Sequence, residues 1–496
     1  MKKTNITKSI IILGCLFGIT TSKAQFTQSA KIVSENRESR AEYGTSVAIS
    51  NEFAMVGASR ETIASGAAYI YGKDIDGNWN FTQRLEAFDP NEGAEFGGGA
   101  KFSDDYLVVA AGRADVNGLQ RTGALYVYDY QNNNWEYSMK LVASDLSAEA
   151  KLGMNPTSLD AEGNTIVAGA PGDNSWTGAA YVFTNNGGTW EEAQKIVSPS
   201  PQPSDVFGIG VSISGDYLAI GANEVDGRKG AVYMYLKDAN GVWEYVQTLV
   251  ASDATDDSFF GTSVSISGDQ LVVGAYGMNL EEGAAYVFEK DAQGTWVEVQ
   301  KLMGNATTEA AQYGWDTDIQ SNIIMVSAPH IFGFEPGEVY FYKKDTNGSW
   351  VEDQIVLGND TVGEDFYGWS VAMHEQQLIV GAPWEDHDAN GGDEIDRAGS
   401  AYIFDNPNIL GGLPNNTLDS FTVYPVPAKN SITIESVNGI SKVVISNQLG
   451  MTLSVESVAD IKEHTFDISS FTEGVYFIKV YHTDGKKSTQ KIVKMN

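Results

Sequence analysis

Apolar and polar residues alternate in short runs along most of this chain, and the runs come in groups of four. In residues 261–302 the four runs are GTSVSIS, QLVVGA, GAAYVFEK and WVEVQKL. Alternation over such lengths is typical of β-strands, and the Asp and Gly residues between the third and fourth runs are typical of tight hairpins. The pattern predicts an all-β chain built from four-stranded antiparallel units.

The group of four runs occurs seven times, and an aromatic-glycine pair marks the start of each unit. A period of about fifty residues with four strands per unit predicts a β-propeller. Small residues fill the first two runs and Tyr, Phe and Trp fill the outer two, as expected for blades that crowd near an axis and splay at the rim. The anchors are Tyr43-Gly44, Phe96-Gly97, Leu152-Gly153 (without the aromatic), Phe207-Gly208, Phe260-Gly261, Tyr313-Gly314 and Tyr367-Gly368.

The fourth run predicts how the ring closes. It begins at a tryptophan in six units, whereas the seventh unit ends near residue 405 without such a run. The segment FTQSAKIV at 26–33 resembles WEEAQKIV at 190–197. We therefore expect residues 25–405 to form a seven-bladed propeller in which the N-terminal strand completes the last blade.

The anchors and the ends of the second runs resemble FG-GAP repeats. The GAP triplet stands at 169–171 and again at 381–383, and every third run begins with a GxxY pattern. The resemblance implies a propeller of the type found in integrin α-subunits and in many secreted bacterial proteins. Kelch repeats are the alternative, because they share the period and the Tyr/Trp pairing, but they need a Gly-Gly doublet that these units do not share.

Residues 421–496 form a second group of alternating runs, which predicts a small Ig-like β-sandwich. Residues 406–420 are rich in Gly, Pro and Asn and read as a linker. The stretches YPVPAKNSITIE, NQLG and DISSFTEGVYFIKV and the basic last strand resemble the C-terminal sorting domain of the Bacteroidetes type IX secretion system. The resemblance implies export by that machinery, followed by release or surface attachment. A generic Ig-like adhesion module is the alternative.

Residues 1–24 have the layout of a secretory signal peptide. They combine a basic start, an apolar stretch at 10–19 and the small-residue end Ser22-Lys23-Ala24, so cleavage is expected before Gln25. The apolar stretch is too short to span a membrane, and no other segment is long enough. The single cysteine, Cys15, lies inside it. The mature protein should therefore have no disulfide, and lipidation of Cys15 is the alternative to simple cleavage.

Acidic residues outnumber basic ones by 65 to 32, which gives a formal net charge of −33. This excess argues against nucleic acid as a partner and favours solubility, cationic partners or divalent metal. No HExxH, Walker, GxSxG or GxGxxG motif is present, and the five histidines show no metal-ligand spacing. The sequence favours a non-enzymatic binding or adhesion protein with an extracellular protein or glycan ligand. An extracellular hydrolase or lyase acting on polysaccharide is the alternative.

The blade topology predicts where a ligand would bind. The links between strands two and three and those between strand four and the next blade should be long and share one face, which we call the loop face. Acidic segments such as EAFDPNEGAE, SDLSAEA, SDATDDS and GNDTVGED fall there. Trp176, Phe332, Phe334 and Trp384 also fall there, where they could stack on a sugar, contact a protein or pack over the blades.

One segment of the seventh unit is a candidate calcium loop. Asp386, Asp388, Asn390, Gly392 and Glu394 fit the spacing D-x-D-x-N-G-x-x-E, which supplies oxygen donors on a tight turn. The resemblance to FG-GAP repeats implies calcium loops between strands one and two, whereas this segment follows a GAP triplet. A polar loop insertion is therefore the alternative. The similar segment 74–77 belongs to a hairpin and is interpreted as a turn.

Overall fold

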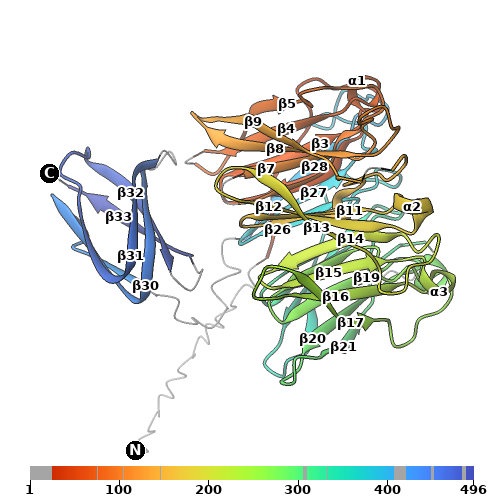
Figure 1. Cartoon of the computed structure of the whole chain (residues 1–496). Helices are drawn as coiled ribbons and strands as arrows, with labels where there is room; N and C mark the ends of the chain where they lie inside the picture. Colours follow the sequence, from red (N-terminus) through yellow and green to blue (C-terminus); the bar gives the residue numbers. More distant parts are fainter. Residues whose placement is uncertain are drawn as a thin grey trace, which may run out of the picture.

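The computed structural model describes residues 25–406 and 421–495, apart from residues 75, 104–105, 146, 305–309, 332, 448–451 and 483–486. The expected signal peptide and nearly all of the expected linker lie outside the described residues. Seven four-stranded antiparallel sheets make up residues 25–406, and one five-stranded sheet makes up the C-terminal part (Figure 1). In the part of the chain that the structure describes, no helix is long and apolar enough to span a membrane.

Six of the seven sheets take their four strands consecutively from the chain. The first three blades are β2 (Tyr43–Ile49), β3 (Phe53–Ala58), β4 (Ala67–Lys73) and β5 (Trp79–Leu85); β6 (Phe96–Phe102), β7 (Tyr106–Ala111), β8 (Ala124–Gln131) and β9 (Asn134–Leu141); and β10 (Leu159–Glu162), β11 (Thr165–Ala170), β12 (Ala179–Asn185) and β13 (Trp190–Ile196). The next three are β14 (Phe207–Ser214), β15 (Tyr217–Ala222), β16 (Ala231–Lys237) and β17 (Trp243–Leu249); β18 (Val264–Ser267), β19 (Gln270–Ala275), β20 (Ala284–Lys290) and β21 (Trp296–Leu302); and β22 (Thr317–Gln320), β23 (Ile323–Ala328), β24 (Glu338–Lys344) and β25 (Trp350–Val356).

The seventh sheet joins the two ends of the ring. It consists of β26 (Val371–His374), β27 (Gln377–Ala382) and β28 (Ser400–Asp405), and β1 (Thr27–Ile32) pairs antiparallel with β28 at its outer edge. Before this strand, the backbone N–H of Phe26 donates to Gln354 Oε1 at 2.8 Å, and Gln354 Nε2 donates back to the Phe26 carbonyl at 2.9 Å. Gln83 makes the same two bonds with Trp135 at the first blade junction. Phe26 thus occupies the place that tryptophan has in other blades.

Close approach of neighbouring blades explains the recurring glycines. The Gly of the second strand lies against the anchor Gly of the next blade, so that a Cβ added to it would stand 1.8–2.0 Å from a backbone oxygen. The anchor glycines on the other side of these contacts have φ between +88° and +102°, which disfavours residues with a side chain. The pairs are Gly57 with Gly97, Gly169 with Gly208, Gly221 with Gly261, Gly274 with Gly314, and Gly381 with Gly44.

The C-terminal part is a nearly closed sheet around its own core. Its strands are β29 (Phe421–Tyr424), β30 (Ser431–Asn447), β31 (Thr452–Asp467), β32 (Gly474–His482) and β33 (Lys487–Lys494), and β30 pairs with β29, β31 and β32. A bridge between Ala428 and Lys494 brings the two edges together. Alternate side chains, among them Ile432, Ile445 and Ile478, are fully buried inside.

Candidate functional site

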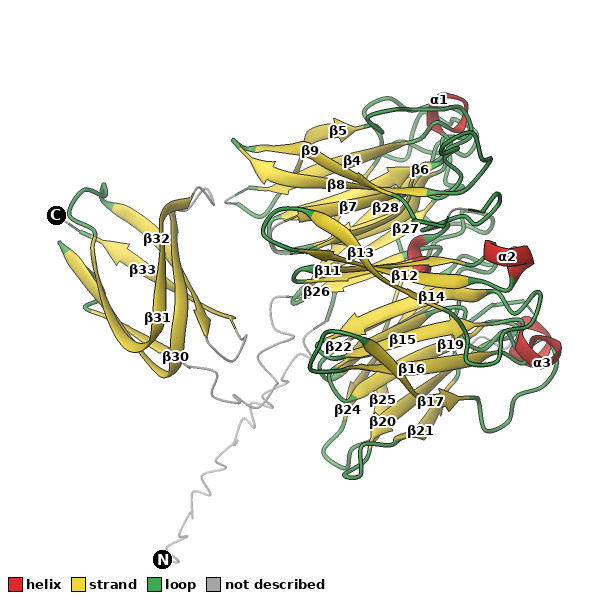
Figure 2. Ribbon diagram, viewed as in Figure 1, coloured by secondary structure: helices red, strands yellow, loops and turns green. Residues whose placement is uncertain are grey.

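The loop face carries four short helical turns with an uncommon hand. They are α1 (Glu61–Ala64), α2 (Asp173–Trp176), α3 (Val225–Arg228) and α4 (Met278–Glu281), each in a link between strands two and three. Three of them lie along one side of the ring (Figure 2). Consecutive residues inside each turn have positive φ, for example Asn279 and Leu280 at +52° and +60°. Left-handed backbone is costly for residues other than glycine. The backbone of these turns is therefore strained, and a side chain projects from it into solvent.

The same face carries the most exposed apolar side chains. Among the described residues, the four large apolar side chains with the highest exposure are Phe334 (86%), Leu280 (82%), Ile63 (75%) and Phe88 (72%). Ile63 and Leu280 occupy equivalent positions in α1 and α4. Phe334 lies between β23 and β24, and Phe88 lies between β5 and β6. All four therefore belong to the loop face.

A row of aromatic rings crosses the last three blades on this face. Phe259 stacks on Tyr276 with 5.0 Å between ring centroids, and Tyr276 lies 5.1 Å from Trp315. Trp315 lies 5.0 Å from Trp369 and donates its Nε1–H to the Trp369 carbonyl at 3.1 Å. These four rings are half-buried. They come from links before and inside three different blades, and we call them, together with the two described next, the aromatic row.

Two further rings and a cation end the aromatic row in the seventh blade. Phe366 lies 5.9 Å from Trp369 and stacks on Trp384 at 4.1 Å. The guanidinium of Arg397 lies 3.5 Å from the centroid of the Trp384 ring. Phe366 is buried, whereas Trp384 is half-buried. Ring faces in this row therefore already accept a cation from the protein itself.

The aromatic row was not predicted, although the sequence contains a signal for it. Trp315 and Trp369 each directly follow an anchor glycine. The other five units have smaller or aliphatic residues at that position, namely Thr45, Gly98, Met154, Ile209 and Thr262. Comparison of the units position by position, rather than by their shared motif, would have identified this departure.

Of the three described aromatic residues among the four expected on the loop face, the structure brings only Trp384 into the aromatic row. Trp176 belongs to the third blade, where the Lys151 ammonium lies 4.2 Å from its ring centroid. Phe334 stands in solvent on the sixth blade. Phe332 lies outside the described residues. The three described side chains therefore do not form one cluster.

Four of the acidic loop residues have a structural role. Each accepts a hydrogen bond from a tyrosine hydroxyl and another from a lysine ammonium, all at 2.6–2.9 Å. Partial burial opposes ionisation, but the bonds from lysine and tyrosine outweigh it and lower the pKa of each carboxyl. They fasten the link between blades to the blade that follows. The sets are Asp89 with Tyr126 and Lys140, Asp145 with Tyr181 and Lys195, Asp253 with Tyr286 and Lys301, and Asp360 with Tyr402 and Lys31.

In the candidate calcium loop, one side-chain oxygen of each candidate aspartate is engaged within the chain. Asp388 Oδ1 accepts the backbone N–H groups of Asn390 and Gly392 at 2.8 and 2.9 Å, and Asp386 Oδ1 accepts that of Arg397 at 2.6 Å. Glu394 Oε1 lies 3.5 Å from a histidine nitrogen. No three His, Cys, Asp or Glu side chains of the described chain are placed to hold a metal ion. The loop would have to rearrange to bind calcium, and calcium binding here stays a prediction.

Carboxyl groups beneath this loop are enclosed rather than open to a substrate. Glu385 is fully buried and contacts Lys31 Nζ at 3.1 Å and Ser400 Oγ at 2.6 Å. Burial raises the pKa of Asp365 to about 7, and this carboxyl accepts the Val362 N–H at 2.7 Å. Asp365 is only 6% exposed. A glycosidase needs two carboxyl groups on either side of a bound sugar, and this pair does not offer that arrangement.

The axis of the ring holds a narrow polar channel of about 190 Å³, lined by the first strands of the blades. Asp316 Oδ2 accepts the Val371 N–H at 2.9 Å, and Asp318 Oδ2 accepts that of Met373 at 2.8 Å. Burial raises the pKa of Asp316 to about 7, against the opposing effects of the Val371 bond and the Lys101 charge. The protonated form of this carboxyl is therefore favoured in the folded ring.

Replacing Asp316 should change how stability depends on pH. The pKa of Asp316 is higher in the folded protein than in the unfolded chain. The stability that this carboxyl contributes is therefore fully present below about pH 4 and is lost as the pH rises through about 7. A pKa shift of this size corresponds to a change of about 4 kcal/mol in the free energy of unfolding. We expect the free energy of unfolding of Asp316→Asn, measured with urea from about pH 5 to 8, to fall less than that of the wild type. The exposed control Asp256→Asn should follow the wild type, and parallel profiles for all three would contradict the assignment.

Comparisons with known proteins agree with this architecture. The FG-GAP repeat family matches residues 26–71, 79–128, 135–183, 190–235, 243–288 and 350–404, together more than half of the chain. The secretion system C-terminal sorting domain matches residues 422–495. Comparison with curated proteins gives no match.

Several solved structures have a similar fold at low sequence identity. They include the periplasmic gluconolactonase PpgL of Pseudomonas aeruginosa (15% identity, TM-score 0.41, 64% of this chain and 86% of that one). A protein from Lactobacillus plantarum (11%, 0.46, 71% and 99%) and Sqt1 of Chaetomium thermophilum (16%, 0.44, 74% and 86%) are also similar. At these levels the likeness carries no functional argument.

Proposed function

Because the chain belongs to the FG-GAP repeat family and ends in a secretion-system sorting domain, we propose that it is an exported, non-enzymatic binding protein. The sorting domain indicates secretion or attachment to the cell surface, with handling by type IX secretion machinery. The ligand that we propose is an extracellular protein, held by the loop face of the propeller.

The exposed apolar side chains carry this proposal. Phe334, Leu280 and Ile63 are each at least 75% exposed, and they stand on three different blades of one face. Exposed apolar groups that gather on one face mark interaction sites, whereas single scattered ones are common. Phe334 and Leu280 stand on the sixth and fifth blades, which the aromatic row also crosses. A glycan would gain little from aliphatic side chains, whereas a protein surface can bury them.

The aromatic row supplies a second component of such an interface. Partly exposed tryptophan and tyrosine are enriched at the centres of protein interfaces, where their large rings contribute most of the binding energy. Trp315 and Trp369 lie next to each other, each just before the first strand of its blade, the sixth and the seventh. Two acidic residues lie near the aromatic row, Glu281 near Tyr276 and Asp386 beside Arg397, and they would favour a partner with basic residues at the rim.

A matched pair of surface variants tests the proposal. Ile63→Ser/Leu280→Ser/Phe334→Ser removes the exposed groups from the loop face. The control is Tyr245→Ser/Val297→Ser/Val351→Ser. It removes three apolar side chains of the outer strands that are 44–49% exposed. We expect wild type and control to bind at least one purified protein on an array of extracellular proteins, and the loop-face variant to lose at least tenfold in affinity. Binding only to glycans, or turnover of a polysaccharide, would overturn the proposal.

Removal of the sorting domain should stop export without unfolding the propeller. The two parts have separate sheets and separate cores, so residues 25–406 should keep their structure alone. We expect a chain lacking residues 421–496 to accumulate in the periplasm, as measured by cell fractionation. Circular dichroism of the truncated protein is the control for folding. Appearance of the truncated chain in the medium or on the cell surface would contradict the role of this domain.

A further inference from the structure

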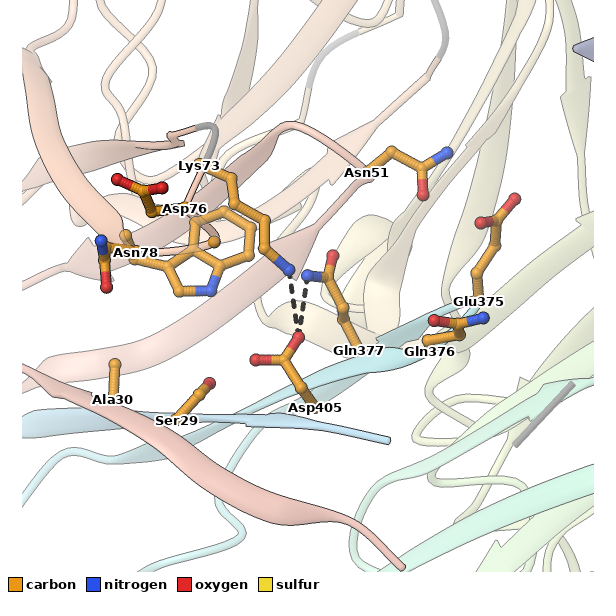
Figure 3. Close-up of a pocket in the computed structure, with 12 residues that line it drawn as sticks. Ser29, Ala30, Asn51, Lys73, Asp76, Asn78, Glu375, Gln376, Gln377 and Asp405 are labelled. Atoms are coloured by element: carbon orange, nitrogen blue, oxygen red, sulfur yellow. Dashed lines mark hydrogen bonds and ion pairs between the residues drawn. The ribbon is translucent and has the colours of Figure 1, made fainter. Parts of the chain in front are cut away.

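A cavity of about 760 Å³ opens at the junction of the seventh and first blades, on the face opposite the loop face. Its walls come from the start of β1, the end of β28, the turn between β26 and β27 and the hairpin between β4 and β5. Figure 3 shows Lys73, Gln377 and Asp405 meeting in its wall. This volume is typical of sites for small molecules.

The cavity borders a junction at which no aromatic residue covers the next tryptophan. At three junctions the first residue of a second strand is aromatic and packs on the tryptophan of the next blade's fourth strand. Phe53 with Trp135 and Tyr106 with Trp190 pair in this way, with ring centroids 5.3 and 4.8 Å apart. In the seventh blade this residue is Gln377. A glutamine does not fill the space of an aromatic ring. Trp350 is nevertheless buried beside Gln270, whereas Trp79 beside Gln377 is only half-buried.

Trp79 differs accordingly from its counterparts. The five other tryptophans at this position, Trp135, Trp190, Trp243, Trp296 and Trp350, are 3–5% exposed, whereas Trp79 is half-buried. Its buried Nε1–H has no hydrogen-bond partner among the described residues. Trp135 and Trp296 also lack one, so the free N–H alone does not mark a site. At Trp79 it coincides with a cavity.

The junction of the fifth and sixth blades shows how the same polar pattern is satisfied without a ligand. There Gln270 pairs with Glu289 across the sheet, and Glu289 Oε1 accepts both the Trp350 Nε1–H at 3.3 Å and the Lys344 ammonium at 2.6 Å. In the seventh blade the corresponding residue is the shorter Asp405. It accepts Lys73 Nζ at 3.1 Å and Gln377 Nε2 at 3.0 Å, but not Trp79 Nε1.

We propose that this cavity binds a saccharide, either a mono- or disaccharide or the end of a longer glycan. Sugar hydroxyls both donate and accept hydrogen bonds, and the cavity offers Lys73 and Gln377 as donors beside Asp405 and Ser29 as acceptors. The indole ring supplies an apolar surface for the C–H groups of the sugar. The site lies on the face opposite the proposed protein interface and is independent of it.

Two variants test this site against a third as control. Gln377→Phe introduces the aromatic residue found at three other junctions, so it should cover the open ring surface of Trp79, abolish binding and leave the protein at least as stable as the wild type. Trp79→Phe replaces the indole by a smaller ring, which should reduce the apolar surface under the sugar and weaken binding about tenfold. Trp135→Phe makes the same change at another junction and should bind like the wild type.

The measurement is isothermal titration calorimetry on the exported protein, with glucose, galactose, N-acetylglucosamine, cellobiose and lactose as probes. We expect at least one of them to bind, with thermal unfolding confirming that Gln377→Phe is folded. The loop-face variant should bind the same sugar unchanged, so failure of the protein-interface proposal would not affect this result. The proposal is overturned if no probe binds the wild type, or if binding persists in Gln377→Phe.

Discussion

Deletion of residues 26–33 should open the propeller at its seventh blade and lower the free energy of unfolding by several kcal/mol. The deletion removes the whole of β1, whose register with β28 runs from Thr27 opposite Asp405 to Ile32 opposite Ala401. It also removes Phe26, which packs 4.6 Å from Phe341 and bonds to Gln354. The edge of β28 would then be exposed, and unpaired edges promote association between chains.

The deletion also uncovers buried charge. Lys31 Nζ lies 2.7 Å from Asp360 and 3.1 Å from Glu385, and the side chain of Glu385 is fully buried. Loss of one partner from a buried ion pair typically costs about 3–5 kcal/mol, because the remaining charge keeps no counter-ion. Lys31→Met keeps the strand and removes the charge, so it should account for much of the loss.

The measurement is urea unfolding of the deletion, of Lys31→Met and of the wild type, with size-exclusion chromatography to follow association. Thr27→Ala is the control, since it changes an exposed position of the same strand. If the deleted protein is monomeric and as stable as the wild type, β1 does not close the ring.

The sequence predicted this closure because the relevant information is local and repeated. Residues 26–33 share the apolar spacing of a fourth strand, and the seventh unit lacks such a strand after residue 405. The propeller followed in the same way from seven copies of one pattern. Each copy reports independently on the strand order, so the degenerate anchor at Leu152 did not change the result.

The features of the loop face could be predicted only in part. The position of the face followed from the alternation of short and long links. The aromatic row did not, because Tyr276, Trp315 and Trp384 occupy different positions in their units and meet only when three blades stand side by side. A search for shared motifs passes over residues that the repeats do not share.

The structural role of the acidic segments was not predicted, for a related reason. Asp145 looks like a free loop carboxylate until its partner Lys195 is placed beside it, and that partner is 50 residues away in the chain. Asp89 and Lys140 repeat the arrangement at a separation of 51 residues. The recurrence of both residues at about one repeat length was the available signal.

Substitution of a glycine at a blade interface should have the second large effect on stability. In Gly221→Ala, the added Cβ would stand 1.9 Å from the carbonyl oxygen of Gly261, an atom of the neighbouring blade's backbone. A contact under 3 Å with backbone cannot be relieved by turning a side chain. The fourth and fifth blades would have to move apart, which would also loosen the packing around Phe260 and Val264.

We expect Gly221→Ala to lower the free energy of unfolding by roughly 3 kcal/mol, at the upper end of the usual cost of overpacking a core. The control is Gly215→Ala in the exposed turn between β14 and β15. A Cβ there meets nothing within 4 Å, but φ is +57°, so that variant should lose only about 1 kcal/mol from left-handed backbone. Both values come from urea unfolding, with circular dichroism to confirm that the sheets are retained. Equal losses in the two variants would mean that contact between blades does not explain the glycines of the repeat. A clearly larger loss at residue 221 would show that each Gly-Ala end is required by the anchor glycine of the next blade.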